Sequence, residues 1–89
     1  MTLPAPFDLV AAALDCDVST LSSDSGLNKH PRWDSLGHVA VMMELEAQYG
    51  VVLDDDSIRR FEDMNAIVEL HRHLAQPGDA IDAASNIDL

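Results

Sequence analysis

The pair Asp34-Ser35 directly precedes an apolar stretch that is typical of a helix. Asp or Ser at such a position commonly caps the helix, because its side-chain oxygen accepts a hydrogen bond from a free backbone N–H. No capping box completes the pattern, since Gly37 and His38 stand where Glu or Gln would be needed. A hydroxyl at a helix start is also exposed, and the partial positive charge of the helix N-terminus favours an incoming phosphate. The two roles are compatible: Asp34 can cap the helix while Ser35 is modified.

Asp34, Ser35 and His38 also supply the residue types of a hydrolase triad. Ser35 and His38 are three residues apart and would share a helical face. Asp34, however, adjoins the serine and has no evident way to orient the far nitrogen of His38. The chain also lacks a Gly-rich oxyanion loop, and so small a domain leaves little room for a substrate pocket. We therefore expect that the chain is not an enzyme.

The acidic run Asp54-Asp55-Asp56 suggests a calcium loop. Such a loop needs an oxygen ligand at its fifth position and Gly at its sixth, but Ile58 and Arg59 stand there. A solvated helix start explains the run better, so we expect no metal site.

Histidine and cysteine residues lack the spacing of a metal or redox site. His71 and His73 are two apart on a predicted helix and point away from each other, and His30 has no neighbouring ligand pattern. Cys16 is the one cysteine and can form no internal disulfide. A small apolar side chain in a reducing cytoplasm is a better interpretation of Cys16 than a catalytic thiol.

The composition indicates one strongly acidic domain. The chain has 89 residues, with 16 Asp and Glu against 5 Lys and Arg, and 47% of its residues are apolar. This charge repels nucleic acid and anionic membranes and suits a partner with a basic patch. No apolar run approaches the roughly 18 residues of a membrane helix, and no secretory signal is visible. We expect a cytoplasmic monomer that neither binds nucleic acid nor inserts into a membrane.

The apolar periodicity predicts an all-α fold of three main helices and one short helix. The first two helices are expected over about Pro6 to Asp15 and from Asp34 or Ser35 to Gly50. A short helix is expected over Asp55 to Arg60 with Asp54 as its cap, and the last helix after Asp63 with a stop at Pro77-Gly78. The last helix carries Met64, Ile67, Leu70 and Leu74 on one face. The long connection Cys16 to Trp33 is expected to be pinned onto the core by Val18, Leu21 and Leu27. Residues 1–76 would form the domain and residues 77–89 a flexible tail.

The second predicted helix carries two apolar stripes on nearly opposite sides. The first holds Leu36, Val39, Ala40, Met43 and Ala47, and the second holds Val41, Met42, Leu45 and Tyr49. A small three-helix domain usually covers one face of each helix, which would leave the other stripe as a contact surface. A central helix buried on both sides is the alternative. Glu44 and Glu46 at the margins favour an interface with a basic partner, but the stripe geometry does not say which side is exposed.

Asp34-Ser35-Leu36 at the start of a helix, in an acidic chain of this size, resembles the acyl carrier protein family. The resemblance covers about residues 3 to 76. The second helix ends Leu45-Glu46-Ala47-Gln48-Tyr49-Gly50, similar to the family's Leu-Glu-Glu-x-Phe ending. A short acidic helix follows, and then Phe61-Glu62-Asp63-Met64 stands where the family often has apolar-Thr-Thr-Val before its last helix.

The resemblance implies a four-helix bundle with a short third helix. It also implies that Ser35, supported by Asp34, receives a 4'-phosphopantetheine arm from coenzyme A. A separate phosphopantetheinyl transferase would supply the metal and activate the hydroxyl, which agrees with the lack of a base near Ser35. The thiol of the arm would then hold an acyl group as a thioester, without any catalytic residue in the carrier.

The resemblance further implies a partner-recognition face, which turns the first stripe outward and the second into the core. By position this face comprises Leu36, Val39, Ala40, Met43, Glu46, Leu53, Asp55 and Ile58. Its expected partners are the transferase, an acyl- or aminoacyl-loading ligase, and a downstream transferase or synthase with a basic docking patch.

Three departures from the family pattern bear on which enzymes dock. Pro31-Arg32-Trp33 replaces the frequent Leu-Gly, Gly37 occupies the first turn of the helix at some loss of helix propensity, and Ala40 stands where many relatives carry an acid. These departures favour a dedicated lipid, polyketide, saccharide-modification or aminoacyl pathway over a housekeeping fatty-acid carrier. Asp34 and the acidic second helix favour acyl over aminoacyl cargo, and both stay open. A different class, an unmodified helical interaction module, would use the same exposed stripe and need no special role for Ser35.

Overall fold

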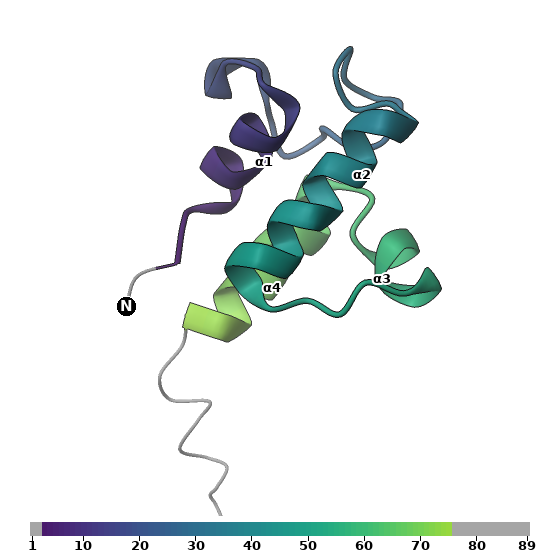
Figure 1. Cartoon of the computed structure of the whole chain (residues 1–89). Coiled ribbons are helices and arrows are strands. Elements are labelled where there is room, and N and C mark those ends of the chain that lie inside the picture. Colours follow the sequence, from purple (N-terminus) through teal and green to yellow (C-terminus); the bar gives the residue numbers. More distant parts are fainter. Residues whose placement is uncertain (1–2, 76–89) are drawn as a thin grey trace, which may run out of the picture.

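The computed structural model describes residues 3–75, which form an all-α bundle (Figure 1). Its elements are α1 (Pro6–Leu14), the 3-10 helix η1 (Val18–Thr20), α2 (Ser35–Glu44), η2 (Leu45–Tyr49), α3 (Asp55–Arg60) and α4 (Met64–Ala75). η2 is a π-helical turn that continues α2 to the end of the predicted second helix. Within residues 3–75 there is no strand, only an isolated bridge between Gly26 and Asp63. The predicted fold class and all four helices are confirmed, whereas η1 was not predicted.

The expected domain boundary after residue 76, the tail 77–89 and the helix stop at Pro77-Gly78 lie outside the described residues. No helix among residues 3–75 has the length and apolar character needed to cross a membrane.

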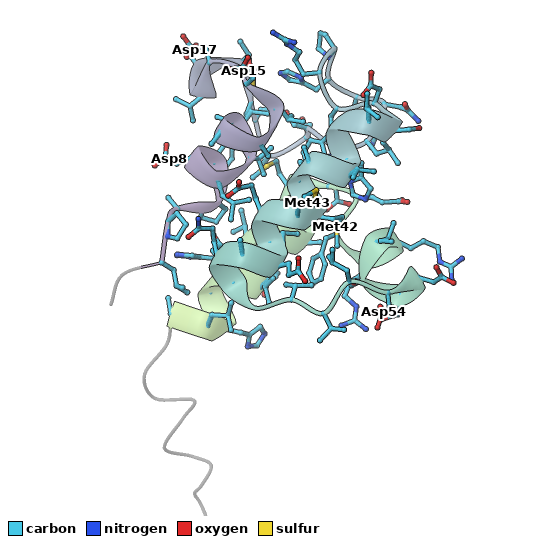
Figure 2. The ribbon with its side chains drawn as sticks, in the orientation of Figure 1. Asp8, Asp15, Asp17, Met42, Met43 and Asp54 are labelled. Atoms are coloured by element: carbon cyan, nitrogen blue, oxygen red, sulfur yellow. The ribbon has the colours of Figure 1, made fainter. Side chains whose placement is uncertain are left out.

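The helix ends follow the predicted local rules. The Asp34 carboxylate accepts a hydrogen bond from the Gly37 N–H at 2.9 Å and so caps α2. Asp54, labelled in Figure 2, accepts from the Ser57 N–H at 2.8 Å, and the Ser57 hydroxyl accepts from the Asp54 N–H at 3.0 Å. This reciprocal pair is a capping box for α3. Gly50 ends η2 with φ of 76°, the left-handed conformation that glycine adopts without strain.

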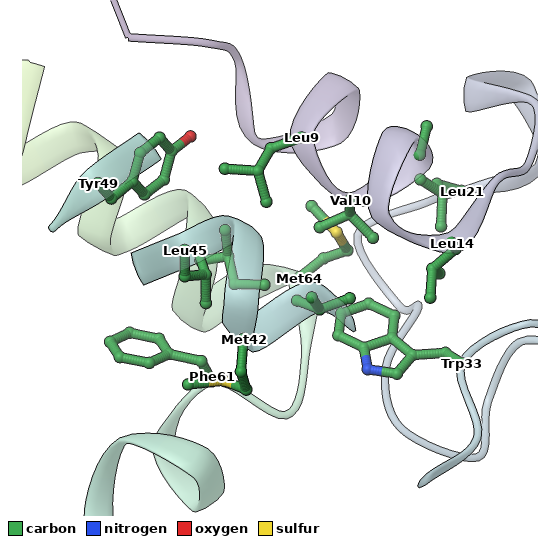
Figure 3. Close-up of a cluster of buried hydrophobic side chains, with 13 residues drawn as sticks. Leu9, Val10, Leu14, Leu21, Trp33, Met42, Leu45, Tyr49, Phe61 and Met64 are labelled. Carbon is green, nitrogen blue, oxygen red and sulfur yellow. The ribbon is translucent and has the colours of Figure 1, made fainter. Parts of the chain in front are cut away.

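The core lies where α1, α2 and α4 meet, with α2 in front of α4 and beside α1 (Figure 1; Figure 3). The second stripe of the predicted helix faces this core, since Val41, Met42, Leu45 and Tyr49 are all buried. They pack with the following side chains of α1, α4 and the connections: Leu9, Val10, Leu14, Leu21, Trp33, Phe61, Met64 and Ile67. The stripe that the resemblance assigned to the interior is therefore confirmed as core.

Two predicted packing residues are exposed to solvent over more than two fifths of their surface. Val18 is 43% exposed, so the prediction that it pins the long connection onto the core is wrong. Val18 instead begins the short helix η1, which Asp17 caps by accepting from the Ser19 N–H at 2.9 Å. Leu21 is buried and Leu27 packs partly against the core, as predicted. Leu74 is 45% exposed because it lies in the last turn of α4, beyond the last fully buried residue, Ile67.

Candidate functional site

Ser35 is the first residue of α2 and is exposed to solvent. The neighbouring Asp34 is also exposed, but its carboxylate is engaged by the Gly37 N–H as the helix cap. The His38 N–H donates to the Asp34 backbone carbonyl at 2.8 Å, which closes the first helical turn. The N–H groups of Ser35 and Leu36 have no such acceptor and remain at the positive end of the helix. Asp34 therefore caps the helix and leaves the Ser35 hydroxyl open to a reagent.

The turn before Ser35 is held in place by backbone and histidine contacts. The Asn28 N–H donates to the Trp33 carbonyl at 2.7 Å, and the Trp33 N–H donates to the His30 carbonyl at 3.0 Å. The His30 ring accepts the Arg32 N–H at Nδ1 and lies 3.0 Å from the Thr20 hydroxyl at Nε2. Both ring nitrogens of His30 are thus engaged by neighbouring residues. These contacts fix the direction from which the chain enters α2.

Gly37 allows this turn to lie directly against α2. A Cβ at Gly37 would overlap the backbone carbonyl oxygen of Arg32 and lie 2.9 Å from a methyl group of Leu14. Sequence analysis identified only a cost of Gly37, its low helix propensity. The structure shows that a glycine is required at this position because the turn approaches the helix closely. The segment Pro31-Arg32-Trp33 and Gly37, identified separately as departures from the family pattern, are therefore one packing arrangement.

The His38 side chain is buried, with 5% of its surface exposed, and its ring makes no hydrogen bond to Ser35. Its Nδ1 accepts the indole N–H of Trp33 at 3.0 Å, and its Nε2 lies 2.7 Å from the Ile58 carbonyl oxygen. Both ring nitrogens are engaged, so His38 offers no base to the exposed Ser35 hydroxyl. This geometry agrees with the rejection of a hydrolase triad.

The first stripe of α2 is exposed. Leu36 is 81% exposed, Val39 56% and Met43 57%, while Ala40 is half-buried. Met42 and Met43, both labelled in Figure 2, are neighbours in the sequence, but Met42 belongs to the buried stripe and is only 3% exposed. The structure thus answers the question that the stripe geometry left open.

Further exposed apolar side chains follow along the chain toward α3. Val52, Leu53 and Ile58 are 73%, 38% and 40% exposed, and Val52 was not among the predicted residues. We call the set Leu36, Val39, Met43, Val52, Leu53 and Ile58 the outer apolar surface. The predicted acids Glu46 and Asp55 are exposed as well. Exposed apolar side chains with acidic neighbours are typical of a docking surface for another protein.

The acidic run Asp54-Asp55-Asp56 serves the start of α3. The hydrogen bond from the Ser57 backbone N–H lowers the pKa of Asp54 below its usual value. Asp56 pairs with Arg60 at 2.7 Å one turn later. No group of three potential metal ligands occurs among residues 3–75. His71 packs against Tyr49, with ring centroids 5.8 Å apart, and Cys16 is half-buried.

Comparison with known proteins gives one group of relatives. No protein-family model matches the chain, and no solved structure matches it. The chain is similar to proteins named acyl carrier protein from Rickettsia canadensis, Rickettsia rickettsii and Rickettsia felis. Each is 29% identical over 62 residues, which cover 70% of this chain and 72% of the relative. This distant similarity supports a family of the acyl-carrier type, whose members are named as carriers rather than as enzymes.

Proposed function

We propose that the chain is a carrier protein that holds an acyl group as a thioester on a 4'-phosphopantetheine arm attached to Ser35. One observation carries the proposal: an exposed serine hydroxyl begins the same helix whose outer face presents unpaired apolar side chains. The similarity to acyl carrier proteins supports this interpretation. A carrier needs these two features together, an attachment point and a surface that successive enzymes can bind.

The attachment reaction needs only a nucleophile from this chain. Ser35 Oγ attacks the pyrophosphate phosphorus of coenzyme A that bears the pantetheine arm. The new Oγ–phosphorus bond forms as the bond from that phosphorus to 3',5'-ADP breaks, and the hydroxyl proton passes to the transferase. The transferase would also supply the base and the metal ion. Both ring nitrogens of His38 are engaged, and one carboxylate oxygen of Asp34 caps the helix.

The residues around Ser35 fit a phosphodiester at this position. The N–H groups of Ser35 and Leu36 lie at the positive end of α2, where a negative charge is stabilised by about 0.3–1 kcal/mol. The turn at Arg32 and Trp33 holds the helix start rigid, so Ser35 has a defined position for the transferase. When attached, the arm supplies the thiol that carries the acyl group.

The outer apolar surface supports docking by enzymes with an apolar patch inside a basic rim. Its exposed acids, Glu46 and Asp55, and the net charge of −11 favour such partners through fast, oriented association. We propose as partners the phosphopantetheinyl transferase, an acyl-loading ligase, and a downstream transferase or synthase of a dedicated lipid, polyketide or other specialised pathway. Asp34 and the acids of the second helix favour acyl cargo, with an aminoacyl or peptidyl carrier as the alternative.

A second candidate is an unmodified helical interaction module. It is favoured by the outer apolar surface itself, which could bind a partner without any modification of Ser35. The two candidates differ in one respect: the interaction module should bind its partner equally well after Ser35→Ala.

The deciding experiment is the intact mass of the purified protein after incubation with coenzyme A, Mg²⁺ and a broad-specificity phosphopantetheinyl transferase. We expect the addition of one phosphopantetheine to the wild type and none to Ser35→Ala. Ser23→Ala, which removes another exposed serine, is the matched control and should be modified normally. Folded wild-type protein that several transferases leave unmodified would overturn the carrier proposal and favour the interaction module.

A further inference from the structure

We propose that His38 is a positioning residue that fixes α3 against α2 and thereby sets the shape of the outer apolar surface. The effect on partner enzymes rests on the proposed carrier function, whereas the effect on α3 does not.

The protonation pattern of the His38 ring follows from its two neighbours. The Trp33 indole N–H can only donate, so Nδ1 of His38 must be the unprotonated, accepting nitrogen. The Ile58 carbonyl can only accept, so Nε2 must carry the proton that it receives at 2.7 Å. The neutral, Nε2-protonated tautomer is the form that satisfies both contacts at once. Trp33, at 0% exposure, therefore selects the tautomer that binds α3.

The Ile58 carbonyl needs this donor because α3 is so short. A six-residue helix leaves its last carbonyl groups without intrahelical partners. The Ser57 carbonyl receives the Phe61 N–H at 3.1 Å, but no backbone N–H in the described chain reaches the Ile58 carbonyl. Within residues 3–75, the bond from His38 is the one side-chain hydrogen bond that joins α2 to α3. Losing it would leave a partly buried carbonyl unsatisfied.

The other hydrogen bonds of α3 do not join it to α2. The Asp54–Ser57 capping box lies within α3 itself, and the Ser57 hydroxyl donates to Val52 in the preceding connection. Phe61, which follows α3, anchors its end in the core. Without His38, no hydrogen bond in the described part of the chain would join α3 to α2.

The position of His38 links the two parts of the outer apolar surface. Its neighbours along α2, Leu36 and Val39, expose their side chains on the first stripe. Its hydrogen-bond acceptor belongs to Ile58, whose own side chain is 40% exposed on α3. One imidazole ring thus joins the turn before Ser35, through Trp33, to the α3 part of the surface. A partner that contacts both helices would bind less well if this ring were replaced.

The first test needs no partner and no modification of Ser35. Nitrogen NMR of the unmodified protein should show His38 as the Nε2-protonated tautomer. In His38→Phe, which keeps an aromatic ring, the amide hydrogens of α3 should exchange about tenfold faster than in the wild type, relative to those of α4. Trp33→Phe, which removes the indole N–H and also shrinks a fully buried ring, should speed exchange in α3 relative to α4 in the same direction. In the conservative variant His38→Gln, which retains an amide donor, the amide hydrogens of α3 should exchange more slowly than in His38→Phe. Met42→Leu is the control and should leave α3 unchanged relative to α4.

The second test uses the transferase. Because His38 touches no reacting atom, His38→Phe should raise the KM for the carrier several-fold and leave kcat nearly unchanged. The Nδ1-protonated tautomer in the wild type, or equal changes in α3 and α4 in the variants, would overturn the proposal. An unchanged KM would overturn its functional part. If the wild type is never modified, the carrier function fails, but the exchange result on α3 still decides the role of His38.

Discussion

The two faces of α2 and η2 have similar apolar side chains and opposite surroundings. Leu45 is fully buried and Leu36 is 81% exposed, although both are leucines on the same helical segment. α1 and α4 pack on one side of α2 (Figure 1). The side chains of Leu36, Val39 and Met43 are more than half exposed. Hydrophobicity therefore does not separate core from surface here. The two faces differ in which other elements of the fold reach them.

The difference has an energetic meaning. Full burial of a leucine or valine side chain stabilises a protein by about 1.5–3 kcal/mol. The side chains of the exposed face do not contribute this burial free energy in the free protein. They can contribute it when a second molecule covers them. This division of one helix into a stabilising face and a binding face can be tested by making the same change on each face.

The largest effect on stability is expected from Leu45→Ala, on the buried face. Removal of the side chain leaves a cavity among α1, α2 and α4, which should lower the free energy of unfolding by about 2–5 kcal/mol. Urea denaturation followed by circular dichroism measures this loss. A loss below about 0.5 kcal/mol, the usual range of surface substitutions, would contradict the assignment of this face to the core.

A smaller effect is expected from Gly37→Ala, between the two faces. Helix propensity alone predicts that alanine stabilises this position by about 1 kcal/mol. The structure predicts the opposite sign, a destabilisation of about 1–3 kcal/mol, because the new Cβ would overlap the Arg32 carbonyl oxygen. The same denaturation experiment separates the two signs. Gln48→Ala, at an exposed position of η2, is the control and should not destabilise the protein.

The smallest effect on stability, within about 0.5 kcal/mol, is expected from Leu36→Ala on the exposed face. This change should nevertheless slow the modification of Ser35 several-fold, because Leu36 adjoins Ser35 and would contact the transferase. Initial rates of mass increase, measured at a carrier concentration below KM, test this expectation. Normal stability together with a normal rate would show that the outer apolar surface has no part in this encounter.

The features predicted correctly from the residues are mostly local ones. The caps at Asp34 and Asp54, the glycine end at Gly50 and the starts of the four helices depend on neighbours within one turn, so sequence analysis found them. Sequence patterns also revealed both stripes of the second helix. The choice between the stripes needed the resemblance to a known family, because it depends on where α1 and α4 pack.

The missed features join parts of the chain that are distant in sequence or packed closely in space. Gly37 is required by the carbonyl of Arg32, and His38 binds Ile58, twenty residues further along the chain. A buried tryptophan needs a partner for its N–H, and this general rule was the one available signal for the Trp33–His38 pair. The prediction that Val18 packs on the core was wrong because Val18 begins η1, which was not predicted, and its side chain is exposed there.

Trp33 and Tyr49 are the one tryptophan and the one tyrosine of the chain, and their rings lie at opposite sides of the core (Figure 3). The Tyr49 hydroxyl donates to the Pro4 carbonyl at 2.7 Å, and burial raises the pKa of Tyr49 to about 12. Because this folded-state pKa lies above the ordinary value of 10.0, the associated stability is complete below pH 10 and declines as the pH rises through about 12. Between pH 10 and about 12 an exposed tyrosine ionises, whereas the buried Tyr49 does not. In this pH range tyrosinate absorbance reports loosening at the Tyr49 end of the bundle, and tryptophan emission reports on the Trp33 end.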